Sequence, residues 1–149
     1  MAASQATVLK AVDVMEREHQ QLGKIFDELA RVLDDVGPDM QADILQQVVR
    51  SGKWLVEWMP QHYHHEEVAI LPELERMGAQ QVATSHEIKQ QHQHLNVQLK
   101  RFGELLGELS ANLNNTELVS RFQHEGRALI KTMHAHMALE RKEFGVLNH

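Results

Sequence analysis

The chain contains no cysteine, which excludes disulfide bonds, thiolate metal sites and cysteine nucleophiles. It also lacks an apolar run of the roughly 20 residues that a membrane-spanning helix needs, so we expect no membrane partner. The first residues show no basic segment followed by an apolar one, so no secretory signal is visible. These absences together predict a cytoplasmic protein.

Positive charge is scarce as well. The sequence has 15 lysines and arginines against 21 acidic residues, a net charge of −6, and no basic stripe, so nucleic acid is not an expected partner. A length of 149 residues and a hydrophobic content of 42% predict a single domain over 1–149 with its own core. The composition has one unusual feature, which is its 11 histidines.

Apolar residues recur at spacings of three and four in four long segments, and no segment alternates as a strand would. Pro60 should kink or split the second segment, Pro72 should disturb its last turns and Gly78 should end it. Thr116 is the expected N-cap of the last segment. The spacing predicts helices over residues 5–34, 40–76, 80–110 and 117–145. Four long helices with short connections predict an all-α, up-down-up-down four-helix bundle.

The two halves of the sequence repeat. A shift of 74 residues places the apolar seam of the second helix on that of the fourth, and a shift of 73 places the first helix on the third. Only four of the 11 histidines lie on these seams, each matched by another histidine, and two are followed by a glutamate one turn later. This set is His19, His62, His92 and His136 with Glu66 and Glu140.

A single seam histidine is usually a core residue bonded to a carbonyl, but four at matched positions favour a metal site. Nitrogen and oxygen donors without sulfur suit iron, manganese or zinc. Both glutamates can bridge two ions, which leaves positions open for a small ligand such as O2, peroxide or NO. Ferritin-like di-iron bundles use Glu-x-x-His pairs, whereas this chain has His-x-x-x-Glu.

These residues resemble the pattern of the hemerythrin-like, HHE cation-binding proteins over nearly the whole chain. The resemblance rests on Glu18-His19, His62-x-x-x-Glu66 with Pro72, His92, and His136-x-x-x-Glu140. It implies a hemerythrin-like four-helix bundle that holds two iron ions in a non-haem di-iron centre. An oxo or hydroxo group can bridge the two ions of such a centre.

The single histidine of the third helix and the glutamate of the fourth are closest to bacterial proteins implicated in repair of iron centres after nitrosative stress. Oxygen-carrying hemerythrins instead have paired histidines and an aspartate there. The repair proteins carry a further histidine late in the first helix, which this chain lacks. His65 and Glu143, each three residues beyond a proposed ligand, are candidates to complete the coordination or to flank it.

Two functions follow as hypotheses. The first is a di-iron protein that binds or reacts with O2, peroxide or NO, or handles iron in the response to oxidative or nitrosative stress. The second is a sensory or interaction bundle in which iron or zinc is structural and nothing turns over. Of the remaining residues, Glu67 is expected on a solvated face, and Trp54 and Trp58 in the core or at an interface.

Overall fold

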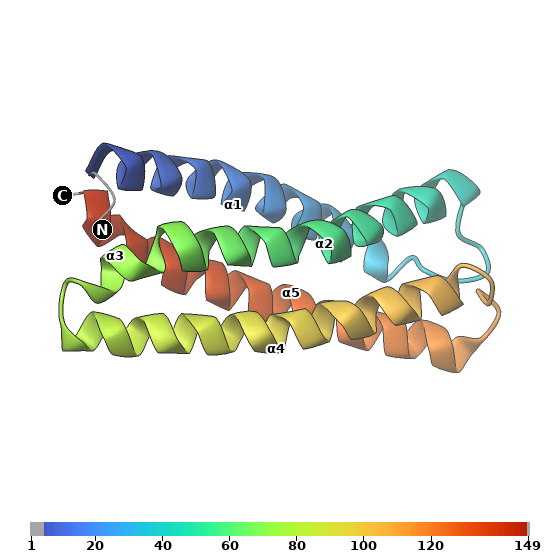
Figure 1. Cartoon of the computed structure of the whole chain (residues 1–149). Coiled ribbons are helices and arrows are strands. Elements are labelled where there is room, and N and C mark those ends of the chain that lie inside the picture. Colours follow the sequence, from blue (N-terminus) through green and yellow to red (C-terminus); the bar gives the residue numbers. More distant parts are fainter. Residues whose placement is uncertain (1–4, 149) are drawn as a thin grey trace.

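The structure is a computed structural model that describes residues 5–148. Within that range every regular element is a helix, as the sequence predicts (Figure 1). The elements are α1 (Gln5–Leu33), α2 (Ala42–Ala69), α3 (Leu71–Glu75), α4 (Ala79–Leu109), α5 (Thr116–Phe144) and a final 3₁₀ turn η1 (Gly145–Asn148). The prediction of an all-α bundle is confirmed.

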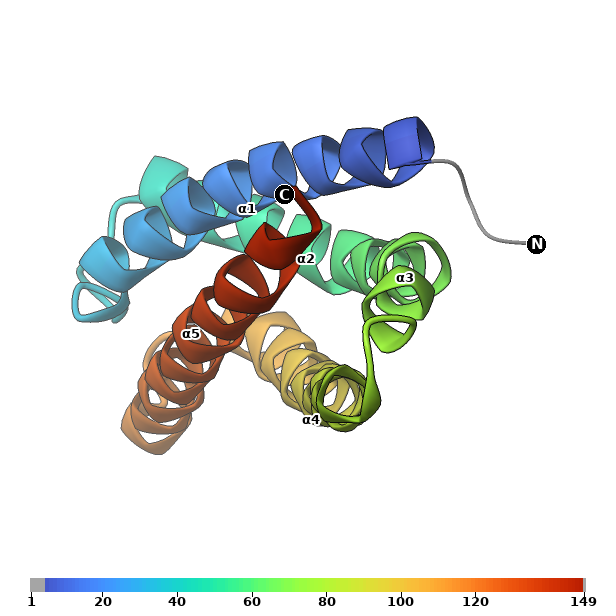
Figure 2. The same ribbon diagram turned by 90° about the vertical axis from the view of Figure 1, so that its left-hand side faces the viewer.

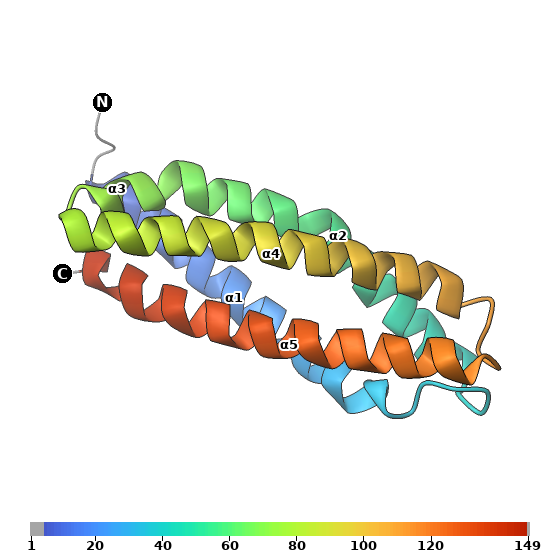
Figure 3. The same cartoon turned by 90° about the horizontal axis from the view of Figure 1, so that it is seen from below.

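The four long helices form a ring of neighbours. Helix α1 packs on α2 and α5, and helix α4 also packs on α2 and α5. Consecutive long helices run in opposite directions, and α4 and α5 lie side by side along their length (Figures 1 and 3). This is the up-down-up-down order, in which the inward faces of four helices meet along one axis.

The second predicted helix, over residues 40–76, is two helices in the structure. Helix α2 continues through Pro60, so a split there was the wrong alternative, but it ends at Ala69. Pro72 explains the break, because it has no N–H to donate to the carbonyl four residues earlier and its ring collides with that carbonyl. It lies instead in the first turn of α3, where the missing N–H costs nothing. Helix α3 then turns beside the start of α4 (Figure 2).

Two helix starts show how the connections are made. Gly78 precedes α4 with φ +145°, a backbone conformation that glycine adopts readily and other residues rarely do. Asn115, and not the expected Thr116, is the N-cap of α5, and its side chain accepts a hydrogen bond of 3.1 Å from the Leu118 N–H.

The core consists of two apolar clusters with a polar layer between them. Each long helix has one apolar neighbour of that layer in the larger cluster and another in the smaller cluster, the second one for α2 being its C-cap residue. The larger cluster contributes Leu22, Met59, Leu95 and Met133. The smaller cluster contributes Met15, Ile70, Ile88 and Phe144. The histidines and glutamates of the repeated set lie between these positions on every helix, so apolar side chains separate them from both ends of the bundle.

Glycines on the inward faces let the helices approach closely. A Cβ atom on Gly52 of α2 would collide with the Leu106 side chain of α4, and one on Gly126 of α5 would lie 2.9 Å from Leu33 Cδ2 of α1. Over residues 5–148 no helix combines the length and apolar character needed to cross a bilayer.

Candidate metal centre

The structure brings the six residues of the repeated set together at one level of the bundle. Each long helix provides one histidine, and α2 and α5 each add the glutamate one turn later. All six side chains are buried, with at most 6% of any residue exposed: His19, His62, Glu66, His92, His136 and Glu140. Six polar side chains in an apolar interior require a compensating partner.

One group of four donors lies toward α1 and α2. His19 Nε2 is 3.4 Å from Glu66 Oε2 and 3.1 Å from Glu140 Oε1. His62 Nε2 is 3.3 Å from the same Glu66 oxygen. The donor atoms of these four residues all lie within 4.8 Å of one another.

A second group lies toward α4 and α5 and uses the same two glutamates. His92 Nε2 is 3.1 Å from Glu66 Oε1 and 3.3 Å from Glu140 Oε2. His136 Nε2 is 3.1 Å from Glu140 Oε1. These donors also lie within 4.8 Å of one another. Glu66 therefore offers one oxygen to each group, and Glu140 is shared by both.

The donor atoms face one another, but most of them form no hydrogen bond. Among the described residues, His19 Nε2, His62 Nε2, His136 Nε2, both oxygens of Glu66 and Oε1 of Glu140 are buried with no hydrogen-bond partner. Of the nitrogen–oxygen contacts within the cluster, only that between His92 and Glu140 has hydrogen-bond geometry. Buried polar atoms left in this state are rare in folded proteins, so the cluster fits a bound cation.

The spacing of the donors supports the same reading. Bonds of about 2.0–2.2 Å from one ion to nitrogen and oxygen ligands place neighbouring ligands about 3.0–3.5 Å apart at tetrahedral or octahedral angles. The nitrogen–oxygen distances in the two groups, 3.1 to 3.4 Å, fall in that range. Each group is therefore spaced as the ligands of one ion would be.

The other nitrogen of three histidine rings is held from a neighbouring helix. His62 Nδ1–H donates to Glu18 Oε2 at 2.7 Å. His92 Nδ1–H donates to Glu67 Oε2 at 3.2 Å. Because these bonds occupy Nδ1, the lone pair of each ring in its neutral form is left on Nε2, which faces the cluster.

His136 completes this set through an amide. Its Nδ1–H donates to Gln91 Oε1 at 2.7 Å. Sequence reasoning missed Gln91 and used Glu18 only as part of a motif. It expected Glu67 on a solvated face, and the side chain is indeed 35% exposed, but the bond to His92 was not foreseen. The signal was available in part, since Glu18 and Gln91 each directly precede a seam histidine and are matched by the 73-residue shift.

The electrostatics of the cluster favour charge on both partners in the absence of metal. Burial alone lowers the pKa of His62, but Glu18 and Glu66 raise it to about 10. Burial likewise lowers the pKa of His92, and Glu140 and Glu66 raise it to about 9. Burial raises the pKa of Glu66, but its histidine neighbours bring it well below the usual range. A cation that binds here must displace protons from the imidazoles.

The two further candidates lie outside both donor groups. His65 is exposed on α2, and Glu143 is only partly buried on α5. Neither belongs to a metal-competent group among the described residues. His65 follows the seam histidine by three residues but is turned away from the bundle axis, so the spacing alone was a weak signal.

Aromatic and sulfur side chains close the cluster on the side of the larger apolar cluster. The Tyr63 ring stacks on His92 with centroids 4.2 Å apart, and its hydroxyl donates to Met133 Sδ at 3.5 Å. Burial, with the charges of Glu140 and Glu66, raises the pKa of Tyr63, so the phenol stays neutral.

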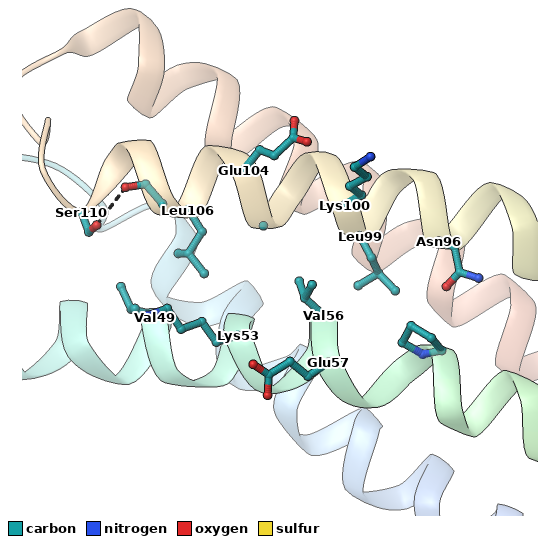
Figure 4. A pocket seen from close by; sticks show the side chains of 13 residues that line it. Val49, Lys53, Val56, Glu57, Asn96, Leu99, Lys100, Glu104, Leu106 and Ser110 are labelled. Atoms are coloured by element: carbon teal, nitrogen blue, oxygen red, sulfur yellow. Dashed lines mark hydrogen bonds between the residues drawn. The ribbon is translucent and has the colours of Figure 1, made fainter.

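Two cavities lie at different distances from this centre. A depression of about 340 Å³ reaches His19 and is lined by Met15, Glu16, Gln20 and Arg141. A larger cavity of about 690 Å³ lies between α2 and α4, with Val56 and Leu99 in its wall and lysine and glutamate side chains at its rim (Figure 4). None of the six donors lines the larger cavity.

Comparison with known proteins gives a single kind of match. No curated protein and no solved structure matches the chain. A family model described as the hemerythrin HHE cation binding domain matches residues 10–146, which span all four long helices and all six buried donors. The chain therefore belongs to the hemerythrin HHE cation-binding domain family and is a metal-binding helical protein.

Proposed function

We propose that this protein is a non-haem di-iron protein that reacts with a small oxidant, peroxide, O2 or NO. His19 and His62 would hold one ion, and His92 and His136 would hold the other, with Glu66 and Glu140 available to both. Iron in this setting supplies one-electron redox chemistry to a ligand at an open position.

The observation that carries the proposal is that two four-donor groups share both of their carboxylates. A single structural ion needs about four donors and would leave the other histidines buried without a partner. The absence of sulfur among the donors favours iron, manganese or zinc, and the family match to a cation-binding domain agrees with this choice.

The chain's own residues restrict what reaches the ions. Apolar side chains cover the donors from both ends of the bundle, which excludes bulk water and large organic molecules. The depression at His19 lies between α1 and α5 and gives a small ligand an approach lined by the opposite charges of Glu16 and Arg141. Such a route suits a diatomic molecule or peroxide.

The test is metal quantification on protein purified without oxygen, followed by optical spectroscopy. We expect two iron ions per chain and near-ultraviolet charge-transfer bands after oxidation, with spectral changes on adding peroxide or NO. His136→Ala should lose iron, whereas His134→Ala, an exposed neighbour on the same helix, should keep it. Zinc with no spectral change would instead support the structural-metal bundle.

The remaining sequence predictions are not tested by the fold or by the family match. They are the closeness to the repair proteins, the role in oxidative or nitrosative stress, the cytoplasmic location and the absence of nucleic-acid and membrane partners. Reactivity with NO against peroxide under the conditions above would separate the two kinds of stress.

A further inference from the structure

Three aromatic rings of α2 form a continuous stack that leads away from the centre. Trp54 stacks on Trp58 with centroids 4.9 Å apart and planes 13° from parallel. Trp58 stacks on His62 with centroids 5.0 Å apart and planes 20° from parallel. The three residues are spaced four apart, so they share one face of the helix.

The stack connects the solvent to a proposed iron ligand. Trp54 has 37% of its surface exposed, Trp58 is partly buried, and His62 is 2% exposed. Trp54 therefore does not belong to the core, contrary to one of the sequence expectations. Packing alone does not account for an exposed indole that continues a stack from a buried ligand ring.

Indole is among the side chains that lose an electron most easily, and near-parallel rings in contact allow that electron to pass from one to the next. We propose that Trp58 and Trp54 form an electron path between the di-iron centre and the surface. The path protects the centre when it reacts with peroxide but its iron ions cannot supply both electrons. The proposal rests on the di-iron function proposed above and adds to it the route by which electrons arrive.

Reduction of one hydrogen peroxide to two waters takes two electrons, and two protons that come from solvent. Where the centre can give only one of the electrons, Trp58 would give the second. Trp58 is then reduced by Trp54, whose oxidised indole releases its N–H proton to solvent. A thiol or ascorbate in solution returns one electron and one proton to Trp54 and is itself oxidised.

Other oxidisable side chains would be damaged if this path were absent. Tyr63 stacks directly on His92, and Met133 receives the Tyr63 hydroxyl hydrogen bond. Both are buried, so no reductant in solution can repair them by contact. An exposed end at Trp54 avoids that difficulty.

The experiment treats iron-loaded protein with peroxide, without added reductant, and locates oxidised residues by mass spectrometry of peptides. In the wild type we expect oxidation products on Trp54 well above the level in metal-free protein. Met77, 49% exposed and outside the stack, serves as the internal control for diffusible oxidants.

Substitution of Trp58 separates a redox role from a packing role. Trp58→Phe keeps a ring in the stack but resists oxidation, so Trp54 oxidation should fall to the metal-free level while oxidation of Tyr63 and Met133 rises. Trp58→Tyr restores an oxidisable ring and should restore oxidation of Trp54. If Trp58→Phe fails to fold, Trp54→Phe should make oxidised Trp58 accumulate instead.

Failure of this path and failure of the di-iron function give different results. If Trp54 is oxidised equally in wild type, Trp58→Phe and Trp58→Tyr while the iron protein consumes peroxide, the path is overturned and the function stands. If the iron-loaded wild type neither consumes peroxide nor shows oxidation above the metal-free protein at any residue, the proposed function fails and the path fails with it.

Discussion

Metal binding should release protons to the solvent, and the number follows from the cluster. Without metal, the pKa of His62 is raised to about 10 and that of His92 to about 9 by the carboxylates that face them. Both rings are therefore protonated at pH 7.5. A metal ion needs the Nε2 lone pair of each, so loading should release at least two protons per chain.

The size of the effect can be estimated. At pH 7.5 the two protons must leave groups whose pKa values lie well above the pH. Their removal costs on the order of 5 kcal/mol at 1.36 kcal/mol per pKa unit, so proton competition weakens the overall constant for binding both ions by nearly four orders of magnitude. This overall constant should rise with pH by about 100-fold per unit, which is about tenfold per unit for each ion.

Metal-free protein should show the opposite dependence. A histidine pKa raised by folding contributes stability that is complete below the unfolded value near 6.5 and is lost as the pH rises through about 9 to 10. Thermal unfolding of the metal-free chain should thus shift to lower temperature at alkaline pH, while the loaded chain gains metal affinity over the same range.

Calorimetric titration with ferrous ion, without oxygen, in Pipes and in Tris measures the released protons, because the two buffers have different protonation enthalpies. The His134→Ala variant should match the wild type, since this ring is exposed and lies outside both donor groups. Equal heats in the two buffers would mean that no protons leave, and the prediction that His62 and His92 are protonated before they bind metal would be refuted.

Three further predictions concern single substitutions. His62→Ala or Glu140→Ala should reduce metal content and lower the melting temperature of the loaded protein, because bound metal contributes to folding free energy. Glu18→Ala should weaken metal affinity by about tenfold in a chelator competition, because His62 loses the acceptor that orients its ring and increases the basicity of Nε2. This is the low end for such partners, since the same change lowers the pKa of His62 and so reduces competition from protons. Gly52→Ala should destabilise by about 1–3 kcal/mol in denaturant unfolding through its collision with α4, whereas Gly23→Ala, with open space around it, should stabilise by about 0.5–1 kcal/mol.

Matched controls decide these three. Glu28→Ala removes the same charge from the same helix at an exposed position, so an affinity loss equal to that of Glu18→Ala would point to general electrostatics. Full metal content in Glu140→Ala would remove that residue from the centre. An unfolding free energy unchanged in Gly52→Ala would show that the Leu106 side chain moves aside at no cost.

The helices and the six buried donors could be predicted because both follow from positions along one helix. A seam of apolar residues fixes the buried face, and a histidine on that seam must point inward. His19, for example, interrupts the apolar spacing of the first helix and is buried in the structure. The matching of the two halves then separates seam histidines from surface ones such as His134.

The contacts between helices could not be predicted in the same way. The bonds from Glu18 to His62 and from Gln91 to His136 depend on the axial offset of neighbouring helices, which no single helix pattern specifies. The acceptor role of Glu67 was missed for this reason, since it depends on where α4 lies. The break after Ala69 was underestimated because Pro72 acts on the turn before it.

The repeat also explains why the two donor groups differ. The 73-residue shift matches Glu18 with Gln91, so His62 has a charged acceptor and His136 a neutral one. The 74-residue shift matches Glu67 with Arg141, a cation that cannot accept a bond from an imidazole N–H. His19, which adjoins Arg141 in the depression, has no such acceptor among residues 5–148.

Basicity of a ligand ring increases with the charge on its outer partner. The two halves of the chain supply equivalent histidine and glutamate donors to the centre. The outer partners, which accept the Nδ1–H bonds of the histidines, differ and make the histidine positions unequal. In the di-iron arrangement that we propose, an ion beside His19 would have the less constrained ligand and the open approach, whereas both rings of the other group are held in place. Duplicated helices with unequal outer partners would then make one ion the site of ligand entry and the other a more rigidly held neighbour.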